Sequence, residues 1–237
     1  MLMVSERMMF RVVVITAFLV TLVAAPATAA RTITENGTNV FVGEENLVFG
    51  GDFAGTSQLV HYAGEVAGSP IDKSIAVTAG MVGSLNGGIP TGCYYAVGSA
   101  YPDLTYVSIQ NPEVTLDVVL DNSRIDSVNG KSVTRNTELA FKVGSNVDTG
   151  DVSDMVTIEV TLPNGGVVTD FGGQSLRYQA NGSTRFIGPI SLNRATAGTY
   201  TTIAKWNRSS DFSGKGCDSR PVTFEPKFAT SLKFLRL

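Results

Sequence analysis

Short runs in which apolar and polar residues alternate, separated by Asn-Gly turns, recur along almost the whole chain and limit what it can fold into. Residues 138–143 and 155–162 show the alternation most clearly. Successive side chains of a strand point to opposite faces, so each run has one core side and one solvent side. Asn129-Gly130 and Asn164-Gly165-Gly166 supply the positive φ of tight turns, and almost no segment shows a helical period. The pattern predicts an all-β protein built as a β-sandwich.

The expected strands form two groups on either side of Pro112. Proline cannot donate to a β-ladder and favours an extended entry into the next strand. We therefore expect an N-terminal β module at residues 31–111 and a C-terminal immunoglobulin-like β-sandwich at residues 112–237. The strands expected are 38–41, 46–49, 58–62, 74–78, 93–97 and 105–109 in the first group and 113–120, 131–134, 138–143, 155–162, 167–170, 175–178, 184–187, 199–206 and 222–225 in the second.

Residues 1–30 read as a signal peptide that is removed before folding. Arg7 and Arg11 precede an apolar stretch at 12–25, and Ala27-Thr28-Ala29-Ala30 offers the small residues that a signal peptidase needs. The stretch is short of the roughly 20 residues that span a bilayer as a helix, and no other apolar run is long enough. We expect a secreted chain that begins near Arg31, lies outside the cell at its surface, and has no membrane span in its mature form.

The charge pattern argues against one class of partner. Only 16% of residues are charged, the formal net charge is -3, and the lysines and arginines are dispersed. A protein that binds nucleic acid needs a basic face to meet the phosphate backbone, so nucleic acid is not an expected partner. Because the chain carries few charges, repulsion between copies is weak, and other copies of the chain are expected partners.

Two cysteines, Cys93 and Cys217, are the whole thiol content of the chain. In an exported protein an even count suggests a disulfide, which would close a loop of about 120 residues. Bridges between neighbouring copies and two independent thiols remain alternatives. Three Asn-X-Ser/Thr sequons make Asn36, Asn181 and Asn207 candidate glycosylation sites.

Candidate chemistry is sparse. Asp148, Asp151 and Asp154 share a loop, and carboxylates gathered in this way bind Ca²⁺, so calcium is the one possible ion; a solvated acidic loop is the alternative. His61 is the single histidine and lies in an alternating run without a nucleophile motif, which places it on a strand surface. We assign no catalytic residue and no cofactor, and do not expect an enzyme.

A Gly-Thr-Tyr sequence opens the late run that ends at Trp206. In immunoglobulin-like modules such a tyrosine occupies the corner between strands, and its hydroxyl bonds back to the chain. Tyr200 is the residue in this position, and a plain core role is the alternative.

Five fragments, in order, carry a resemblance to a known family. They are Val40-Phe41-Val42-Gly43-Glu44-Glu45-Asn46-Leu47, Gly92-Cys93-Tyr94-Tyr95, Val107-Ser108-Ile109-Gln110-Asn111-Pro112 with 114–118, residues 130–135 with 139–141 and 145–146, and Ala197-Gly198-Thr199-Tyr200. The sequence resembles the repeating extracellular module of S-layer-related and sheath proteins of methanogenic archaea, over nearly the whole mature chain. This resemblance implies location and architecture rather than activity.

The resemblance leaves two functions to weigh. A short, single-unit chain is similar to a subunit of a sheath or S-layer that polymerises through strand edges, and residues 32–42, which lack proline and lysine, are the expected donor strand. The alternative is a secreted carbohydrate-binding or adhesin module, in which exposed rings among Tyr94, Tyr95, Tyr101 and Tyr106 stack on sugars. Envelope proteins and glycans are then further possible partners.

Overall fold

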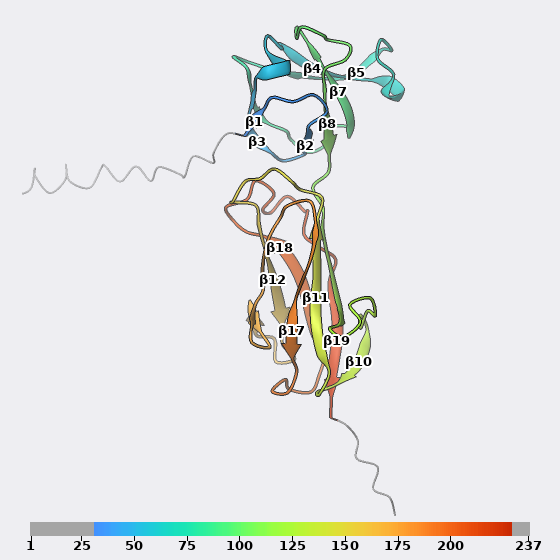
Figure 1. Ribbon diagram of the computed structural model, residues 1–237, viewed down its shortest axis with the longest axis vertical. Helices are drawn as coiled ribbons and strands as arrows, with labels where there is room; N and C mark the ends of the chain where they lie inside the picture. Colours follow the sequence, from blue (N-terminus) through green and yellow to red (C-terminus); the bar gives the residue numbers. More distant parts are fainter. Residues whose placement is uncertain (1–30, 229–237) are drawn as a thin grey trace, which may run out of the picture.

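The computed structural model describes residues 31–228, and these form an elongated molecule with two β-rich parts along its long axis (Figure 1). The predicted signal peptide lies outside the described residues. Apart from two single 3-10 turns, η1 (Gly51–Phe53) and η2 (Ala63–Glu65), the regular structure is strand, which confirms the all-β prediction. Within residues 31–228 no helix has the length and apolar character to cross a membrane.

The N-terminal module contains two sheets that enclose one core. The smaller sheet has the order β1-β3-β6, and the larger has the order β2-β8-β7-β4-β5. Leu47, Leu59 and Ile109 lie in the core between them. The strands are β1 (Thr32–Ile33), β2 (Asn39–Phe41), β3 (Glu45–Phe49), β4 (Gln58–Tyr62), β5 (Ile71–Ala76), β6 (Met81–Ser84), β7 (Gly92–Val97) and β8 (Tyr106–Gln110).

The C-terminal module packs a three-stranded sheet, β17-β11-β9, against a larger sheet that runs β10-β19-β18-β12, with β13 and β16 both paired to β12. Phe141 from one sheet and Ile158 and Tyr200 from the other share its core. The strands are β9 (Val114–Leu120), β10 (Lys131–Thr134), β11 (Glu138–Ser145), β12 (Met155–Thr161), β13 (Val167–Val168), β14 (Asp170–Phe171), β15 (Gln174–Ser175), β16 (Arg177–Gln179), β17 (Thr184–Ser191), β18 (Tyr200–Trp206) and β19 (Val222–Lys227).

The alternation that predicted the strands also sets which residues are buried. Val156, Ile158 and Val160 of β12 are fully buried, and the residues between them are half-buried. In β11 the pattern is less regular, because Ala140 and Gly144 are buried too, although the core cluster takes only Leu139, Phe141 and Val143 from this strand. The pairing register with β17 shifts between Leu139, opposite Ile190, and Phe141, opposite Ile187, so the extra residue of this β-bulge lies in β17.

The expected donor strand at residues 32–42 pairs within its own chain, and its role between copies stays a prediction. β1 runs parallel to β3, with Thr32 opposite Val48, and β2 runs parallel to β8, with Asn39 opposite Ser108. The segment is thus divided between two sheets of the N-terminal module, and it is the outer strand of each, paired on one side only.

The two modules share no sheet, yet a β2 side chain joins them. Phe41 is fully buried within the C-terminal core, where its ring meets Phe212 edge-on at a centroid distance of 6.2 Å. Beside it, the Lys215 ammonium donates to the Gly43 carbonyl at 2.7 Å and pairs with the Glu45 carboxylate at 2.9 Å. The junction therefore combines a buried aromatic contact with a polar clasp.

Candidate functional site

Three tyrosine rings form a row across the larger sheet of the N-terminal module. Tyr62 ends β4, Tyr95 lies in β7 and Tyr106 begins β8, and these three strands are neighbours in the sheet. Tyr95 is directly opposite Tyr106, with ring centroids 5.8 Å apart, and the Tyr62 and Tyr95 centroids are 5.5 Å apart. All three are partly exposed. They form a continuous aromatic strip on the outer face of the sheet.

Alternation along β7 explains why Tyr95 is in the strip and its neighbour is not. Tyr94 points to the opposite face, is fully buried, and donates its hydroxyl to the Pro90 carbonyl at 2.9 Å. Burial raises the pKa of Tyr94 to about 12. Desolvation also raises the pKa of Tyr95, helped by the nearby Cys93 thiol. The Tyr95 phenol is therefore a neutral hydrogen-bonding group at ordinary pH.

Polar side chains of β2 and β8 continue the strip on one side. The Gln110 amide donates to Asn39 at 2.9 Å and to the Ser108 hydroxyl at 3.4 Å. The Asn36 side-chain oxygen accepts the Tyr106 backbone N–H at 2.9 Å, which fixes the loop before β2 beside the last ring. Rings that offer apolar faces, bordered by amides and hydroxyls, suit a ligand with both C–H faces and hydroxyl groups.

Of the four tyrosines singled out from the sequence, the structure brings only Tyr95 and Tyr106 together. Tyr101 stands in the loop at 98–105 and is 69% exposed. Tyr62 was not predicted, because it lies more than thirty residues before the cluster in sequence and only the sheet order places β4 beside β7. The sequence offered one signal for Tyr62, namely that a predicted strand, residues 58–62, ends in this tyrosine.

The prediction of a surface histidine is also wrong. His61 is 6% exposed on the inner face of β4, opposite Tyr94, and the two rings lie 5.1 Å apart. Its Nδ1 atom lies 2.6 Å from the Asp72 carboxylate. Burial against Tyr94 makes this histidine part of the module's interior, under the tyrosine row.

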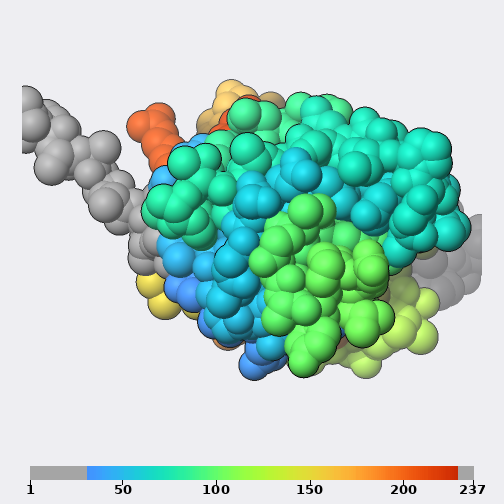
Figure 2. Space-filling model, turned by 90° about the horizontal axis from the view of Figure 1, so that it is seen from above, coloured from blue at the N-terminus to red at the C-terminus, as the bar shows by residue number. Residues whose placement is uncertain are grey.

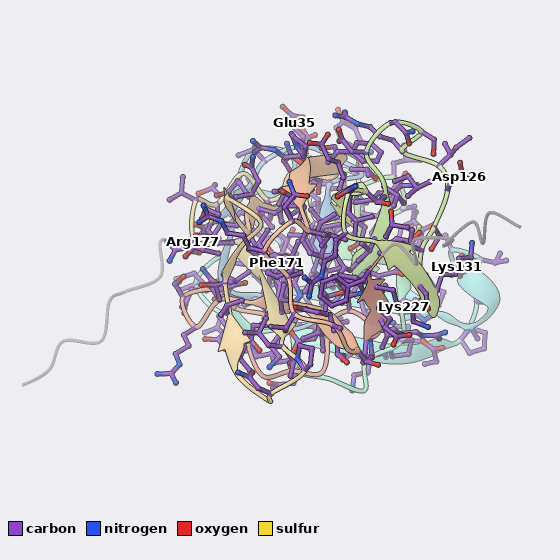
Figure 3. All side chains as sticks on the ribbon, turned by 90° about the horizontal axis from the view of Figure 1, so that it is seen from below. Glu35, Asp126, Lys131, Phe171, Arg177 and Lys227 are labelled. Atoms are coloured by element: carbon purple, nitrogen blue, oxygen red, sulfur yellow. The ribbon has the colours of Figure 1, made fainter. Side chains whose placement is uncertain are left out.

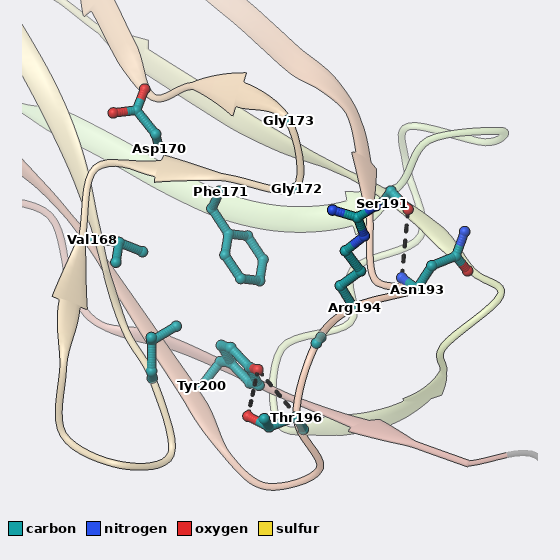
Figure 4. Close-up of a pocket in the computed structure, with 12 residues that line it drawn as sticks. Val168, Asp170, Phe171, Gly172, Gly173, Ser191, Asn193, Arg194, Thr196 and Tyr200 are labelled. Atoms are coloured by element: carbon teal, nitrogen blue, oxygen red, sulfur yellow. Dashed lines mark hydrogen bonds between the residues drawn. The ribbon is translucent and has the colours of Figure 1, made fainter.

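A pocket, separate from the tyrosine row, lies at the far end of the C-terminal module. It has a volume of about 570 Å³ and opens between the β14–β15 hairpin and the loop that follows β17 (Figure 4). Phe171 points into it above Tyr200, with the two ring centroids 5.4 Å apart, and Val168 forms a side wall. Arg194 lies across the opening from Val168. We call this hollow the end pocket.

Tyr200 is both a core residue and a tyrosine corner, the two roles considered for it. Its ring is 1% exposed in the core, and its hydroxyl donates to the Thr196 carbonyl at 3.1 Å, four residues upstream. The bond ties the loop before β18 to the strand, as in a tyrosine corner, and so shapes one wall of the end pocket.

The three aspartates proposed for calcium do not converge. Asp154 is buried and accepts hydrogen bonds from the Thr149 and Ser210 hydroxyls, and burial raises its pKa. Asp151 accepts the Ser153 N–H at 2.8 Å, and Asp148 is exposed. Within residues 31–228 no group of three or more carboxylate, histidine or cysteine side chains is placed to hold a metal ion. These carboxylates organise their loop instead.

Both cysteines are free thiols in the structure, so the expected Cys93–Cys217 bridge is not formed. Cys93 lies in β7 of the N-terminal module, opposite Ser108, whereas Cys217 follows β18 in the C-terminal module. Cys93 is part of a strand of the N-terminal sheet, and Cys217 packs against the C-terminal core from the segment before β19, which sequence spacing does not reveal. Bridges between copies remain a prediction.

The three sequon asparagines lie outside strand interiors. Asn36 and Asn181 are exposed, and Asn207 is half-buried directly after β18. The Asn207 side-chain oxygen accepts the Thr157 hydroxyl, and the Asn181 oxygen accepts the Ser183 hydroxyl. Glycans at these positions remain predictions.

The family is decided by a model that matches residues 36–217, described as "Domain of unknown function (DUF3821)". The chain belongs to this family. The matched DUF3821 region contains the tyrosine row, the junction and the end pocket. A search of curated proteins finds no match.

One similar solved structure is the crystal structure of a tetra-tandem repeat in the extending region of a large adhesion protein. It is 13% identical, with a TM-score of 0.30, over 75% of this chain and 44% of that one. The DUF3821 chain thus spans less than half of that structure. We draw no conclusion about fold or function from a TM-score this low.

Proposed function

We propose that the chain is a non-catalytic, extracellular carbohydrate-binding module of a cell surface, and that the row formed by Tyr62, Tyr95 and Tyr106 is its binding face. The single observation that supports this proposal is the continuity of the row, with neighbouring centroids 5.5 and 5.8 Å apart on the exposed side of one sheet. Aromatic rings supply large, rigid contact area to the apolar faces of sugars.

The surroundings of the row fit a neutral ligand. The pKa of Tyr95 is raised, so its hydroxyl stays protonated, and the nearby Ser108 and Gln110 side chains are uncharged. A partly exposed strip, in which neighbouring rings are tilted by 52° and 46°, accommodates an extended chain of sugar residues better than a single small molecule, which needs a concave site. We therefore infer a polysaccharide rather than a monosaccharide as the ligand.

Affinity electrophoresis of the chain from Arg31 onward in gels that contain hydroxyethylcellulose or glycol chitin tests this function. Tyr95→Ala removes the central ring and its contact with the sugar, and we expect affinity to fall about tenfold, which corresponds to about 1.4 kcal/mol. Tyr101→Ala is the matched control, because Tyr101 is exposed but lies off the row. Equal retardation of both variants and the parent chain would rule out the row as the binding face.

A second function, a structural subunit of an archaeal sheath or S-layer, is favoured by a different observation. β5 is the outer strand of its sheet, pairs only with β4, and exposes Ile71 to 54%. An unpaired edge of six residues can add a strand from a neighbouring copy. The resemblance to sheath and S-layer modules supports the same role, with other copies and envelope proteins as partners.

Electron microscopy of the chain from Arg31 onward, with and without Ca²⁺, tests the structural role. We expect ordered sheets or tubes, and we expect Ile71→Lys with Ala76→Lys to abolish lateral order, because like charges would face each other along the edge. Val152→Lys, at a position 84% exposed in the C-terminal module, is the control. A chain that stays monomeric at every concentration would contradict self-assembly.

A further inference from the structure

One end of the long axis carries a protruding loop and the other end carries a pocket, so the two ends are complementary in shape. The upper end is the loop at 98–105, between β7 and β8, which stands out in green in the view from above (Figure 2). The lower end holds the end pocket. Seen from below, Phe171 lies near the middle of the projected molecule, whereas Arg177 stands toward its rim (Figure 3). Phe171 therefore lies close to the long axis.

The upper loop presents two large apolar side chains from a closed turn. Tyr101 and Leu104 are each 69% exposed, and the Tyr101 carbonyl accepts the N–H groups of Leu104 and Thr105 at 3.0 and 2.9 Å. Pro102 occupies the second position of this turn, where its fixed φ is favourable. Such a turn loses little conformational entropy when it binds.

The lower pocket offers the matching surface. Phe171, Tyr200 and Val168 give it apolar walls, and its volume of about 570 Å³ accommodates more than one large side chain. Arg194 is exposed at its rim and forms no ion pair with any residue in the described range 31–228. The carboxylate of Asp170, the other charged lining residue, points away from the pocket (Figure 4).

We propose that the loop at 98–105 of one copy docks into the end pocket of the next. Tyr101 and Leu104 then contact Phe171 and Tyr200, and the exposed Asp103 carboxylate meets the Arg194 guanidinium. The charge between the two apolar residues of the loop matches the one unpaired cation of the pocket rim. This occupant is a second copy of the chain, and the inference rests on the structural role proposed above.

The geometry of this contact makes the assembly open-ended. The loop and the pocket are different surfaces at opposite ends, so the contact is heterologous and generates a filament along the long axis unless rotation closes a ring. Pairing at the β5 edge would be lateral. Together, one axial and one lateral contact are the minimum for a two-dimensional layer.

The decisive experiment reverses the charges, and sedimentation velocity over a range of concentrations reports association. Arg194→Asp and Asp103→Arg should each weaken association about tenfold, because like charges then face each other at the contact. A mixture of the two single variants should regain association, since each variant's altered surface then meets the other's. The chain that carries both substitutions should regain it as well.

An apolar variant tests the rest of the contact. Tyr101→Ser with Leu104→Ser should abolish axial association, while Val152→Ser, at an apolar residue that is 84% exposed and belongs to neither the loop nor the end pocket, should leave it unchanged. All substituted loop and rim residues are exposed, and circular dichroism would verify that each variant folds.

Each contrary outcome overturns a stated part of the proposal. Association that is the same in every variant would exclude the end contact while leaving edge-mediated assembly intact. Failure of the mixed variants to recover would exclude the pairing of Asp103 with Arg194. No association of the parent chain at any concentration would overturn both this contact and the structural role.

Discussion

Phe41 offers the sharpest test of how the modules are joined. It belongs to a strand of the N-terminal sheet, yet its side chain is fully buried in the C-terminal core against Phe212. Replacing a buried phenylalanine by alanine costs about 3–5 kcal/mol. We therefore expect Phe41→Ala to lower the unfolding temperature of the C-terminal module, although the substitution lies in the N-terminal part of the sequence.

A double-mutant cycle isolates the contact itself. The two rings meet edge-on at 82°, a geometry worth about 0.5–1.5 kcal/mol beyond area burial. The combined Phe41→Ala and Phe212→Ala variant should therefore be less destabilised than the sum of the single variants by that amount. Calorimetry resolves the transitions of the two modules, and urea unfolding gives the free energies for the cycle.

Phe53→Ala is the matched control for this cycle. Phe53 is 1% exposed and lies in the N-terminal core beside Phe49. Its replacement should cost a similar free energy but lower the N-terminal transition, and it should be additive with Phe212→Ala within about 0.3–0.5 kcal/mol. Equal additivity for Phe41 and Phe53 would refute the claim that Phe41 couples the modules.

Three further predictions concern single groups. Tyr200→Phe removes the hydrogen bond to Thr196 and should lower the free energy of unfolding by about 0.5–1.5 kcal/mol in urea titrations, whereas an unchanged value would mean that the corner bond is not stabilising. Burial raises the pKa of Glu44 in the folded protein, so the parent chain should gain stability relative to Glu44→Gln as the pH falls toward the ordinary glutamate value of 4.5, and parallel stability curves would contradict this. Cys93 and Cys217 should titrate as two thiols per chain in denaturant without reductant, and should react slowly when folded because burial raises the pKa of both; fewer than two would indicate a bridge.

Most of the strands could be predicted because strand formation leaves a local mark. The alternation in β11 and β12, the Asn-Gly turns and the entry at Pro112 are all read within a few residues. β6 was not predicted, because Met81–Ser84 contains a glycine and only one buried residue, Val82, so that it carries little alternation of its own. It is a strand because β3 pairs with it.

What only the tertiary structure decided are the relations between residues far apart in the chain. Sheet order places Tyr62 beside Tyr95, the packing of two modules buries Phe41 in the second core, and Cys93 and Cys217 remain free thiols in different modules. By itself the sequence determined the all-β class and the inward or outward direction of residues in regularly alternating strands such as β12, since both follow from a period of two, whereas His61 of β4 was placed on the wrong face. Which strand becomes whose neighbour depends on non-local pairing, and no local pattern in the sequence records it.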